Sequence, residues 1–214
     1  MKKIFLFTLL SLTLGMMSSC ENKDKEPTRN EENGHEWVDL GLSVKWATCN
    51  VGATKPEEFG DYFAWGETSP KTSYTKENYT YTETSNVLPL SADAANANWG
   101  GDWRLPTQAE LEELLDKCTW TWCWNYNGNK GLYGYIVTSK INGKAIFLPS
   151  ASLYIGDELD DFIEGYGAYM TSTYLGIDNL GRSVSTGLFF HELAFDWGPF
   201  DTYRGYPVRA VIAK

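Results

Sequence analysis

The chain has 214 residues, and its 28 acidic side chains outnumber its 18 basic ones to give a formal net charge of −10. A surface of this sign repels nucleic acid and anionic lipid headgroups, so the composition excludes a nucleic-acid-binding role. The length suits one domain with a substantial core.

The first residues are typical of a secretory signal that ends at a lipidated cysteine. Two lysines precede an apolar run from Ile4 to about Met17, shorter than the roughly 20 residues of a bilayer span. Small residues come directly before Cys20, as in the lipobox of bacterial lipoproteins. We therefore expect residues 1–19 to be a signal peptide and Cys20 to carry lipid, palmitate included. This predicts an outer-membrane lipoprotein, periplasmic or surface-exposed, with the membrane as a partner.

Residues 20–35 have the composition of a solvated linker. The stretch ENKDKEPTRNEENGH is almost entirely polar and has no apolar periodicity, so it cannot bury enough surface to fold alone. We predict a disordered tether over 20–35 and a single folded domain over 36–214.

Regular patterns begin directly after this linker. Apolar and polar residues alternate from 38 to 46, which predicts a half-buried strand interrupted by a hairpin turn at Gly41. A short helix is predicted over 92–98. A second helix follows with stronger sequence signals, because Thr107 and Glu110 form a capping box and leucines recur on one helix face.

The segment CTWTWC, residues 118–123, is predicted to be a strand. Trp and Thr favour strands over turns, and alternation places Cys118, Trp120 and Trp122 on one face. The cysteines at its two ends then lie too far apart for a disulfide. A zinc or redox site lacks ligands, because the chain has only two histidines and no C-x-x-C spacing.

Cys49 is the remaining candidate for disulfide pairing. An exported domain folds under oxidising conditions, so we predict a bridge between Cys49 and Cys118, with Cys49 to Cys123 as the alternative. Either pairing leaves one thiol over.

The second half of the folded part is predicted to be mostly β. Two β-rich runs flank Asn142-Gly143, the dipeptide that a type I′ hairpin turn favours because both central residues need a positive φ. Further short strands are predicted over 169–173, 187–195 and 207–212. One or two helices beside many short antiparallel strands indicate an α+β domain with long loops.

Several phrases together resemble one known family. They are WVDLGLSVKWATCNVGA, FGDYFAWGET, WGGDWRLPTQAELEEL, IFLPSAS and YPVRAVIAK, and they span nearly all of residues 36–214. The chain is similar to the Fibrobacter succinogenes major paralogous domain, which is common among surface and secreted lipoproteins of the Bacteroidota. The resemblance implies a C-type lectin-like fold, related to that of the formylglycine-generating enzymes, and no established activity.

Three positions depart from the family pattern. Ser152 stands where a glycine is expected, Met170 follows Tyr169 where a Trp is usual, and Cys123 takes the place of a Thr. The change at Met170 weakens any argument for a family-wide ligand surface there.

The sequence contains no catalytic motif. His191-Glu192 begins like a zincin helix, but Phe195 stands where the second His belongs, and there is neither a nucleophile elbow nor a glycine-rich phosphate loop. We expect no enzyme activity, no catalytic residues and no cofactor. A formylglycine-generating activity is disfavoured, because those enzymes use a late pair of cysteines and no Cys follows Cys123.

An acidic loop is a candidate cation site. Asp157, Glu158, Asp160, Asp161 and Glu164 supply oxygen ligands of the kind that Ca²⁺ prefers, but the EF-hand spacing is missing. A solvated acidic loop is the simpler interpretation, and calcium binding is kept as a hypothesis.

Aromatic residues make up 15% of the chain, and several of them stand in segments that are predicted to be loops. Rings beside Asn and Gly in loops can stack on sugars, whereas others close over the core. Because lectin-like folds bind ligands on the long loops of their second half, the resemblance directs attention there. The candidate contacts are Trp124, Tyr126, Asp157, Asp160, Tyr166, Trp197 and Tyr203.

The expected function is that of a lipid-anchored, non-enzymatic binding or adhesion module whose partner is an extracellular glycan or protein. The alternative is a structural or assembly subunit of the cell surface. Self-association of the purified protein would favour the alternative.

Overall fold

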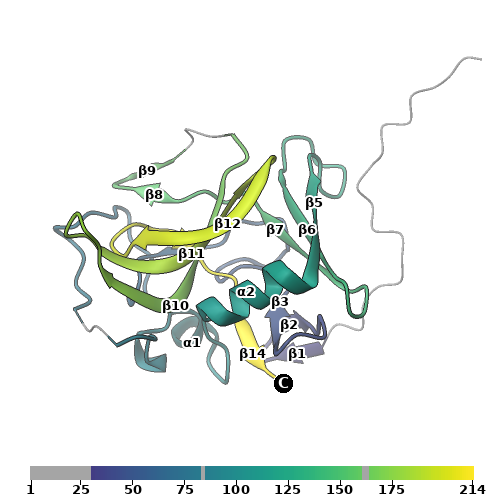
Figure 1. Ribbon diagram of the computed structural model, residues 1–214, viewed down its shortest axis with the longest axis horizontal. Coiled ribbons are helices and arrows are strands. Elements are labelled where there is room, and N and C mark those ends of the chain that lie inside the picture. Colours follow the sequence, from purple (N-terminus) through teal and green to yellow (C-terminus); the bar gives the residue numbers. More distant parts are fainter. Residues whose placement is uncertain (1–29, 83–84, 161–163) are drawn as a thin grey trace, which may run out of the picture.

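The computed structural model describes residues 30–82, 85–160 and 164–214 (Figure 1). The predicted signal peptide and Cys20 lie outside these ranges. None of the described helices has the length and apolar character needed to cross a bilayer. Two short α-helices accompany several small antiparallel sheets in the described residues, which confirms the α+β class.

The two ends of the described chain meet in one sheet. Its strand order is β1 (Asn30–Glu32), β2 (His35–Val38), β3 (Val44–Ala47) and β14 (Val211–Ala213). The boundary predicted at residue 36 is therefore several residues too late, because the chain is already paired at β1. Backbone hydrogen bonds suffice for an edge strand, so the missing apolar periodicity did not prevent pairing.

The first predicted hairpin is confirmed. β2 and β3 pair in antiparallel fashion, and Gly41 sits in the connection with a φ of 79°. The amide of Gly41 donates a hydrogen bond to Asp39 Oδ1 over 2.8 Å, which fixes the turn. A residue with a side chain would be strained at this φ.

The hairpin around Asn142-Gly143 forms, but its turn differs from the prediction. β6 (Gly134–Ser139) and β7 (Ala145–Pro149) pair in antiparallel fashion across a longer loop. Gly143 has a φ of 74°, whereas Asn142 is not among the described residues with a positive φ. Ser139 Oγ accepts hydrogen bonds from the amides of Ile141 and Asn142 and holds the loop in this alternative shape.

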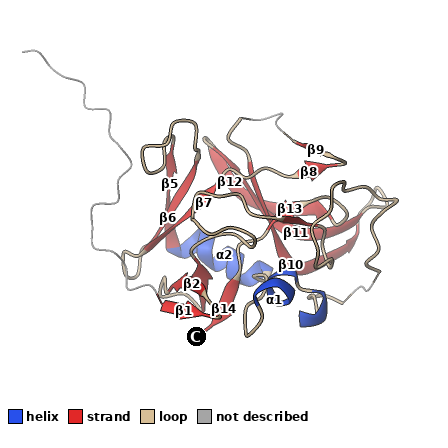
Figure 2. Ribbon diagram, turned by 180° about the vertical axis from the view of Figure 1, so that it is seen from behind, coloured by secondary structure: helices blue, strands red, loops and turns tan. Residues whose placement is uncertain are grey.

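Both predicted helices are present. α1 (Ala94–Trp99) is capped by Asp93, and α2 (Gln108–Lys117) has the complete capping box of Thr107 and Glu110. α2 lies in the middle of the molecule, against β10 and β11 on one side and β5 on the other (Figures 1 and 2). Its buried leucines join the sheets to one another.

The CTWTWC segment is the strand β5 (Cys118–Cys123), as predicted. Thr119 and Thr121 are exposed, whereas Trp120 and Trp122 are half-buried and pack against the core. Their rings meet Tyr135 edge-on at 5.5 and 5.0 Å between centroids. These two tryptophans are therefore packing groups.

The predicted Cys49–Cys118 disulfide is absent, and none of the three described cysteines is disulfide-bonded. Cys49 packs in the core cluster that contains Trp65 and Trp103, whereas Cys118 packs in the cluster around α2. The Cys49 thiol donates to the carbonyl of Ala53 over 3.4 Å. The alternative pairing with Cys123 is absent too.

The largest sheet holds β10 (Gly167–Ile177), β11 (Ser183–His191) and β12 (Ala194–Asp201), in that order. The strand predicted over 187–195 is in fact the turn of the β11–β12 hairpin with its flanks. The strands predicted over 169–173 and 207–212 fall in β10 and in β13 and β14. The other elements are β4 (Tyr62–Phe63), η1 (Leu90–Ala92), β8 (Tyr154–Ile155), β9 (Glu158–Leu159) and β13 (Tyr206–Pro207).

A buried arginine joins these parts. Arg209 is only 2% exposed, and burial lowers its pKa. Its Nε donates to Asn50 Oδ1 over 2.9 Å, and its Nη1 donates to the carbonyls of Ala47, Thr48 and Phe147 over 3.2, 3.2 and 3.0 Å. The guanidinium thus connects the chain before β14, the end of β3 and the strand β7.

We predict that Arg209→Lys lowers the free energy of unfolding by about 3 kcal/mol or more, because the ammonium cannot reach all of these acceptors and leaves buried oxygens unpaired. Urea unfolding followed by Trp fluorescence measures this loss. Arg104→Lys is the matched control: Arg104 pairs with Glu110 nearer the surface, and about 1 kcal/mol or less is expected. Equal losses in the two variants would contradict the role of Arg209.

A second prediction concerns the thiols. An alkylating agent added in denaturant without reductant should label Cys49, Cys118 and Cys123, and a tryptic fragment ending at Lys130 should carry two labels. The native protein should react slowly, because all three are buried and burial raises the pKa of Cys118 to about 11. Mass spectrometry with and without prior reduction makes the comparison. A label that appears only after reduction would reinstate a disulfide.

Candidate ligand-binding site

Two hollows stand out among the described residues. One has a volume of about 530 Å³ and the other about 460 Å³, within the range of roughly 300–1,000 Å³ of small-molecule sites. We call them the Glu67 pocket and the Arg204 pocket. The first is lined by Gly66, Glu67, Thr68, Ser69, Lys71, Asn78, Thr80, Tyr81, Ser91 and Ala92. The second is lined by Leu153, Tyr166, Arg182, Phe189, His191, Pro199, Phe200, Asp201, Arg204 and Tyr206.

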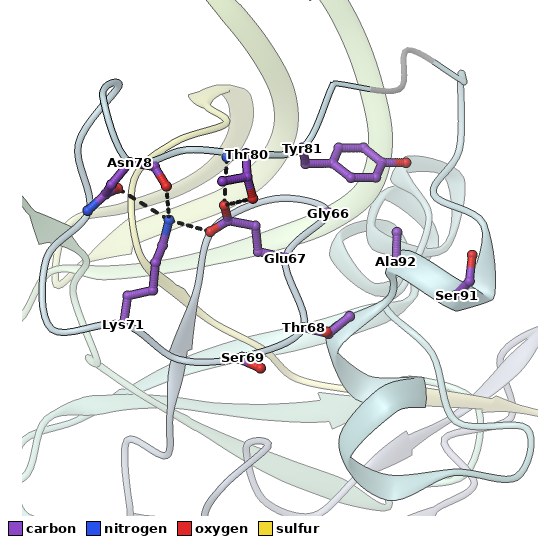
Figure 3. A pocket seen from close by; sticks show the side chains of 10 residues that line it. All are labelled: Gly66, Glu67, Thr68, Ser69, Lys71, Asn78, Thr80, Tyr81, Ser91 and Ala92. Carbon is purple, nitrogen blue, oxygen red and sulfur yellow. Dashed lines mark hydrogen bonds and ion pairs between the residues drawn. The ribbon is translucent and has the colours of Figure 1, made fainter.

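The charged groups of the Glu67 pocket bind one another (Figure 3). Lys71 Nζ lies 2.5 Å from Glu67 Oε2 and donates to the carbonyl and to Oδ1 of Asn78 over 3.0 and 3.2 Å. Glu67 Oε1 accepts from the amide and from the hydroxyl of Thr80, both over 2.9 Å. All three ammonium protons of Lys71 thus have acceptors. The network fixes the loop and leaves little charge for a ligand.

The Arg204 pocket has an aromatic wall built by strand alternation. Phe189 and His191 point from β11 to the face that lines the pocket, while Leu188 and Phe190 point into the core. Phe200 lies over Gly187 of the same sheet, where an added Cβ would come within 2.3 Å of the ring. Glycine at this position therefore allows the ring to lie flat.

A carboxylate and two guanidinium groups meet at this pocket. The Asp201 side chain is only 4% exposed; its Oδ1 lies 3.3 Å from Arg182 Nη1 and its Oδ2 lies 2.9 Å from Arg204 Nη2. Arg182 also binds Asp178 through Nη2 and Nε, at 2.7 and 2.8 Å. The hydrogen bond with Asp178, followed by the charge of Asp201, raises the pKa of Arg182.

Two polar atoms of this group are left without hydrogen bonds in the described part of the chain. They are Nε of Arg204 and Oδ1 of Asp201, and both are buried. Buried polar atoms without partners are uncommon in folded proteins, because each costs free energy. Oδ1 is engaged by its ion pair with Arg182, so of these two atoms Arg204 Nε is the one without any partner.

Tyr166 adds a neutral hydroxyl to the pocket. Burial, followed by the nearby charge of Asp160, raises the pKa of Tyr166. The hydroxyl therefore stays protonated near neutral pH and can donate a hydrogen bond.

Three of the seven candidate contacts lie at or beside this pocket. Tyr166 lines it, and Asp160 is close enough to act on the Tyr166 hydroxyl. Lys76 Nζ and Arg204 Cζ both lie over the ring of Tyr203, at 5.5 and 6.0 Å from its centroid. Tyr203 thus contacts the pocket through Arg204 without lining it.

The other four candidates are not among the residues that line the pocket. Trp197 pairs with Leu188 on the opposite sheet face, Tyr126 stacks on Phe147 at 3.7 Å between centroids, and Trp124 and Asp157 are exposed elsewhere. The structure does not bring these seven residues into one site.

The charged centre of the pocket was not predicted from the sequence. Arg182, Asp201 and Arg204 belong to no recognised sequence motif, and Phe189 was predicted only as part of a strand. One signal was available: the chain has few arginines, and DTYRG places an acid, a Tyr and an Arg within four residues.

The described residues contain no group of three or more Asp, Glu, His or Cys side chains arranged to hold a metal ion. Asp161 of the acidic loop lies outside the described ranges, so calcium binding there stays a prediction. Comparisons with protein-family models, with curated proteins and with solved structures each returned no match. The resemblance to the major paralogous domain therefore stays a prediction too.

We predict that Asp201→Asn lowers the free energy of unfolding by about 1–2 kcal/mol, because two guanidinium groups then face each other without their shared carboxylate. The loss stays below that of a fully buried pair, since both arginines are about one-third exposed. Thermal and urea unfolding measure it. Asp116→Asn breaks an exposed pair with Lys117 and should change nothing measurable. An unchanged Asp201→Asn variant would show that the cluster contributes no stability.

Proposed function

We propose that the protein is a lipid-anchored, non-enzymatic module of the cell envelope that binds an extracellular glycan in the Arg204 pocket. The supporting observation is a buried donor without a hydrogen-bond partner, Arg204 Nε, beside an aromatic wall. Sugar hydroxyls both donate and accept hydrogen bonds, and one face of a pyranose ring carries mostly C–H groups. Such a ring matches both features of the pocket.

The position of the chain ends favours this use of the pocket. β1 and the C-terminus lie on one side of the molecule, while β8 and β9 lie on the opposite side (Figures 1 and 2). A tether that runs from lipidated Cys20 to β1 would hold the first side toward the membrane. The loops next to the pocket, which include Leu153 and Tyr166, would then face outward.

Ser152 supports a C-type lectin-like domain of the major paralogous type. It stands where that family is expected to have glycine, and its φ is 50°. This left-handed conformation is uncommon for residues other than glycine. The backbone thus has the shape that a glycine would favour, even though the residue differs.

One observation favours the assembly alternative. The β11–β12 hairpin ends in exposed apolar side chains: Leu193, Phe195 and Trp197 are 84%, 38% and 37% exposed. A formylglycine-generating activity gains no such support, because Cys49, Cys118 and Cys123 are all buried.

Binding is tested with the purified full chain in a polyoxyethylene detergent, which carries no sugar that would compete. Isothermal titration against a panel of mono- and oligosaccharides should find at least one ligand. Phe189→Ala should weaken the binding of that ligand tenfold or more, which is roughly 1.4 kcal/mol, because the stacking ring is removed. Trp124→Ala, an exposed ring outside the pocket, is the control and should bind normally. Silence across the panel in a folded, monomeric protein would refute the proposal, and so would loss of binding in the control alone.

A further inference from the structure

The Arg204 pocket brings two arginines together on an acidic protein. The described ranges hold four arginines, and two of them, Arg182 and Arg204, line this one pocket. Arg209 is buried in the core and Arg104 is paired with Glu110. Within the lining, these two guanidinium groups face the single carboxylate of Asp201.

The two arginines are not equally engaged. Arg182 is held by Asp178 through two nitrogens and by Asp201 through a third. Arg204 contacts Asp201 through Nη2 alone, and its Nε is buried without a hydrogen bond. The capacity to bind a further anion therefore lies with Arg204, whose side chain is 30% exposed.

The acidic groups near Arg204 do not use this capacity. Asp201 occupies one nitrogen, Asp160 acts on the Tyr166 hydroxyl, and Asp178 binds the far arginine. The rings of Tyr166 and Phe189 in the same lining offer apolar faces. A ligand that combines an apolar ring face with one negative group could pack on these rings and bind Arg204.

We propose that the bound glycan carries a carboxylate, as a uronic or a sialic acid does, and that this carboxylate binds Arg204. The assignment rests on the proposed function and deepens it. A carboxylate is planar and fits the planar fork of a guanidinium, and such charge-assisted hydrogen bonds are stronger than those to hydroxyl groups. A sulfate monoester carries the same charge, but its oxygens are much less basic than those of a carboxylate and accept weaker hydrogen bonds from the guanidinium.

Three ligands separate these possibilities: a methyl glucuronide, the matching methyl glucoside and glucose 6-sulfate, each titrated into the full chain in the same detergent. The glucuronide should bind at least tenfold more tightly than either of the others. Its affinity should fall as NaCl rises from 0.05 to about 0.5 M, whereas the affinity for the glucoside should stay constant. Sialic acid with its carboxylate free and as a methyl ester repeats the comparison on a second ring.

Two variants locate the effect. Arg204→Lys keeps the charge and loses the fork, so the preference for glucuronide over glucoside should fall to about threefold or less. Arg104→Lys, which does not line the pocket, should keep the full preference. Melting temperatures of both variants establish that they are folded, and the comparison of ligands on the unchanged protein does not depend on either variant.

The outcomes are distinct. Equal affinity for glucuronide and glucoside, or tighter binding of the sulfate, would overturn the carboxylate assignment and leave the glycan function standing. No binding of any sugar would overturn both. An unchanged preference for glucuronide over glucoside in the Arg204→Lys variant would show that Arg204 does not bind the carboxylate.

Discussion

The fold depends on how the buried charge of Arg209 is accommodated. A guanidinium withdrawn from water is costly, and here carbonyl oxygens and the amide of Asn50 replace the lost water at Nε and Nη1, while Nη2 has no hydrogen-bond partner among the described residues. Those oxygens belong to segments far apart in the chain, so the requirement for several acceptors at once brings the segments together. The C-terminal strand β14 follows directly and pairs with β3. The requirement of one buried side chain for hydrogen-bond acceptors thus helps to hold β14 beside β3 in the terminal sheet.

The same network reaches toward the candidate site. Asn50 also donates to the hydroxyl of Tyr169 over 3.3 Å, and that hydroxyl donates to the carbonyl of Pro149 over 2.7 Å. Tyr169 belongs to β10, whose neighbour β11 carries Phe189 and His191 on the face that lines the Arg204 pocket. The hydrogen-bond network of Arg209 therefore ends on β10, the direct neighbour of the strand β11 that carries the pocket wall. A rigid core supports the site from behind, which suits binding without a large rearrangement.

Features with a local cause were predictable. The capping box of Thr107 and Glu110, the strand CTWTWC and the two hairpins depend on residues close in sequence, and the structure contains all of them. What depends on distant partners was not predictable: β1 pairs without apolar residues, Ser139 reshapes the Asn142 turn, and the cysteines are separated by the division of the core into two clusters. The centre of the pocket combines both kinds: Asp201 and Arg204 are three residues apart, but Arg182 joins them only once the β11–β12 hairpin has formed.

The two pockets differ in how they use polar groups, and this difference is a better guide to function than their sizes. In the Glu67 pocket the buried carboxylate, the ammonium and the Asn78 side chain saturate one another, so the network contributes to stability and needs nothing further. In the Arg204 pocket the donor Arg204 Nε is buried without a partner, which costs free energy unless a ligand supplies an acceptor. Acidic residues dominate the chain as a whole, so a polyanion would be repelled by the surface while a single carboxylate on an otherwise neutral sugar would not. Surface repulsion and the incompletely paired guanidinium of Arg204 together select a ligand with one well-placed charge.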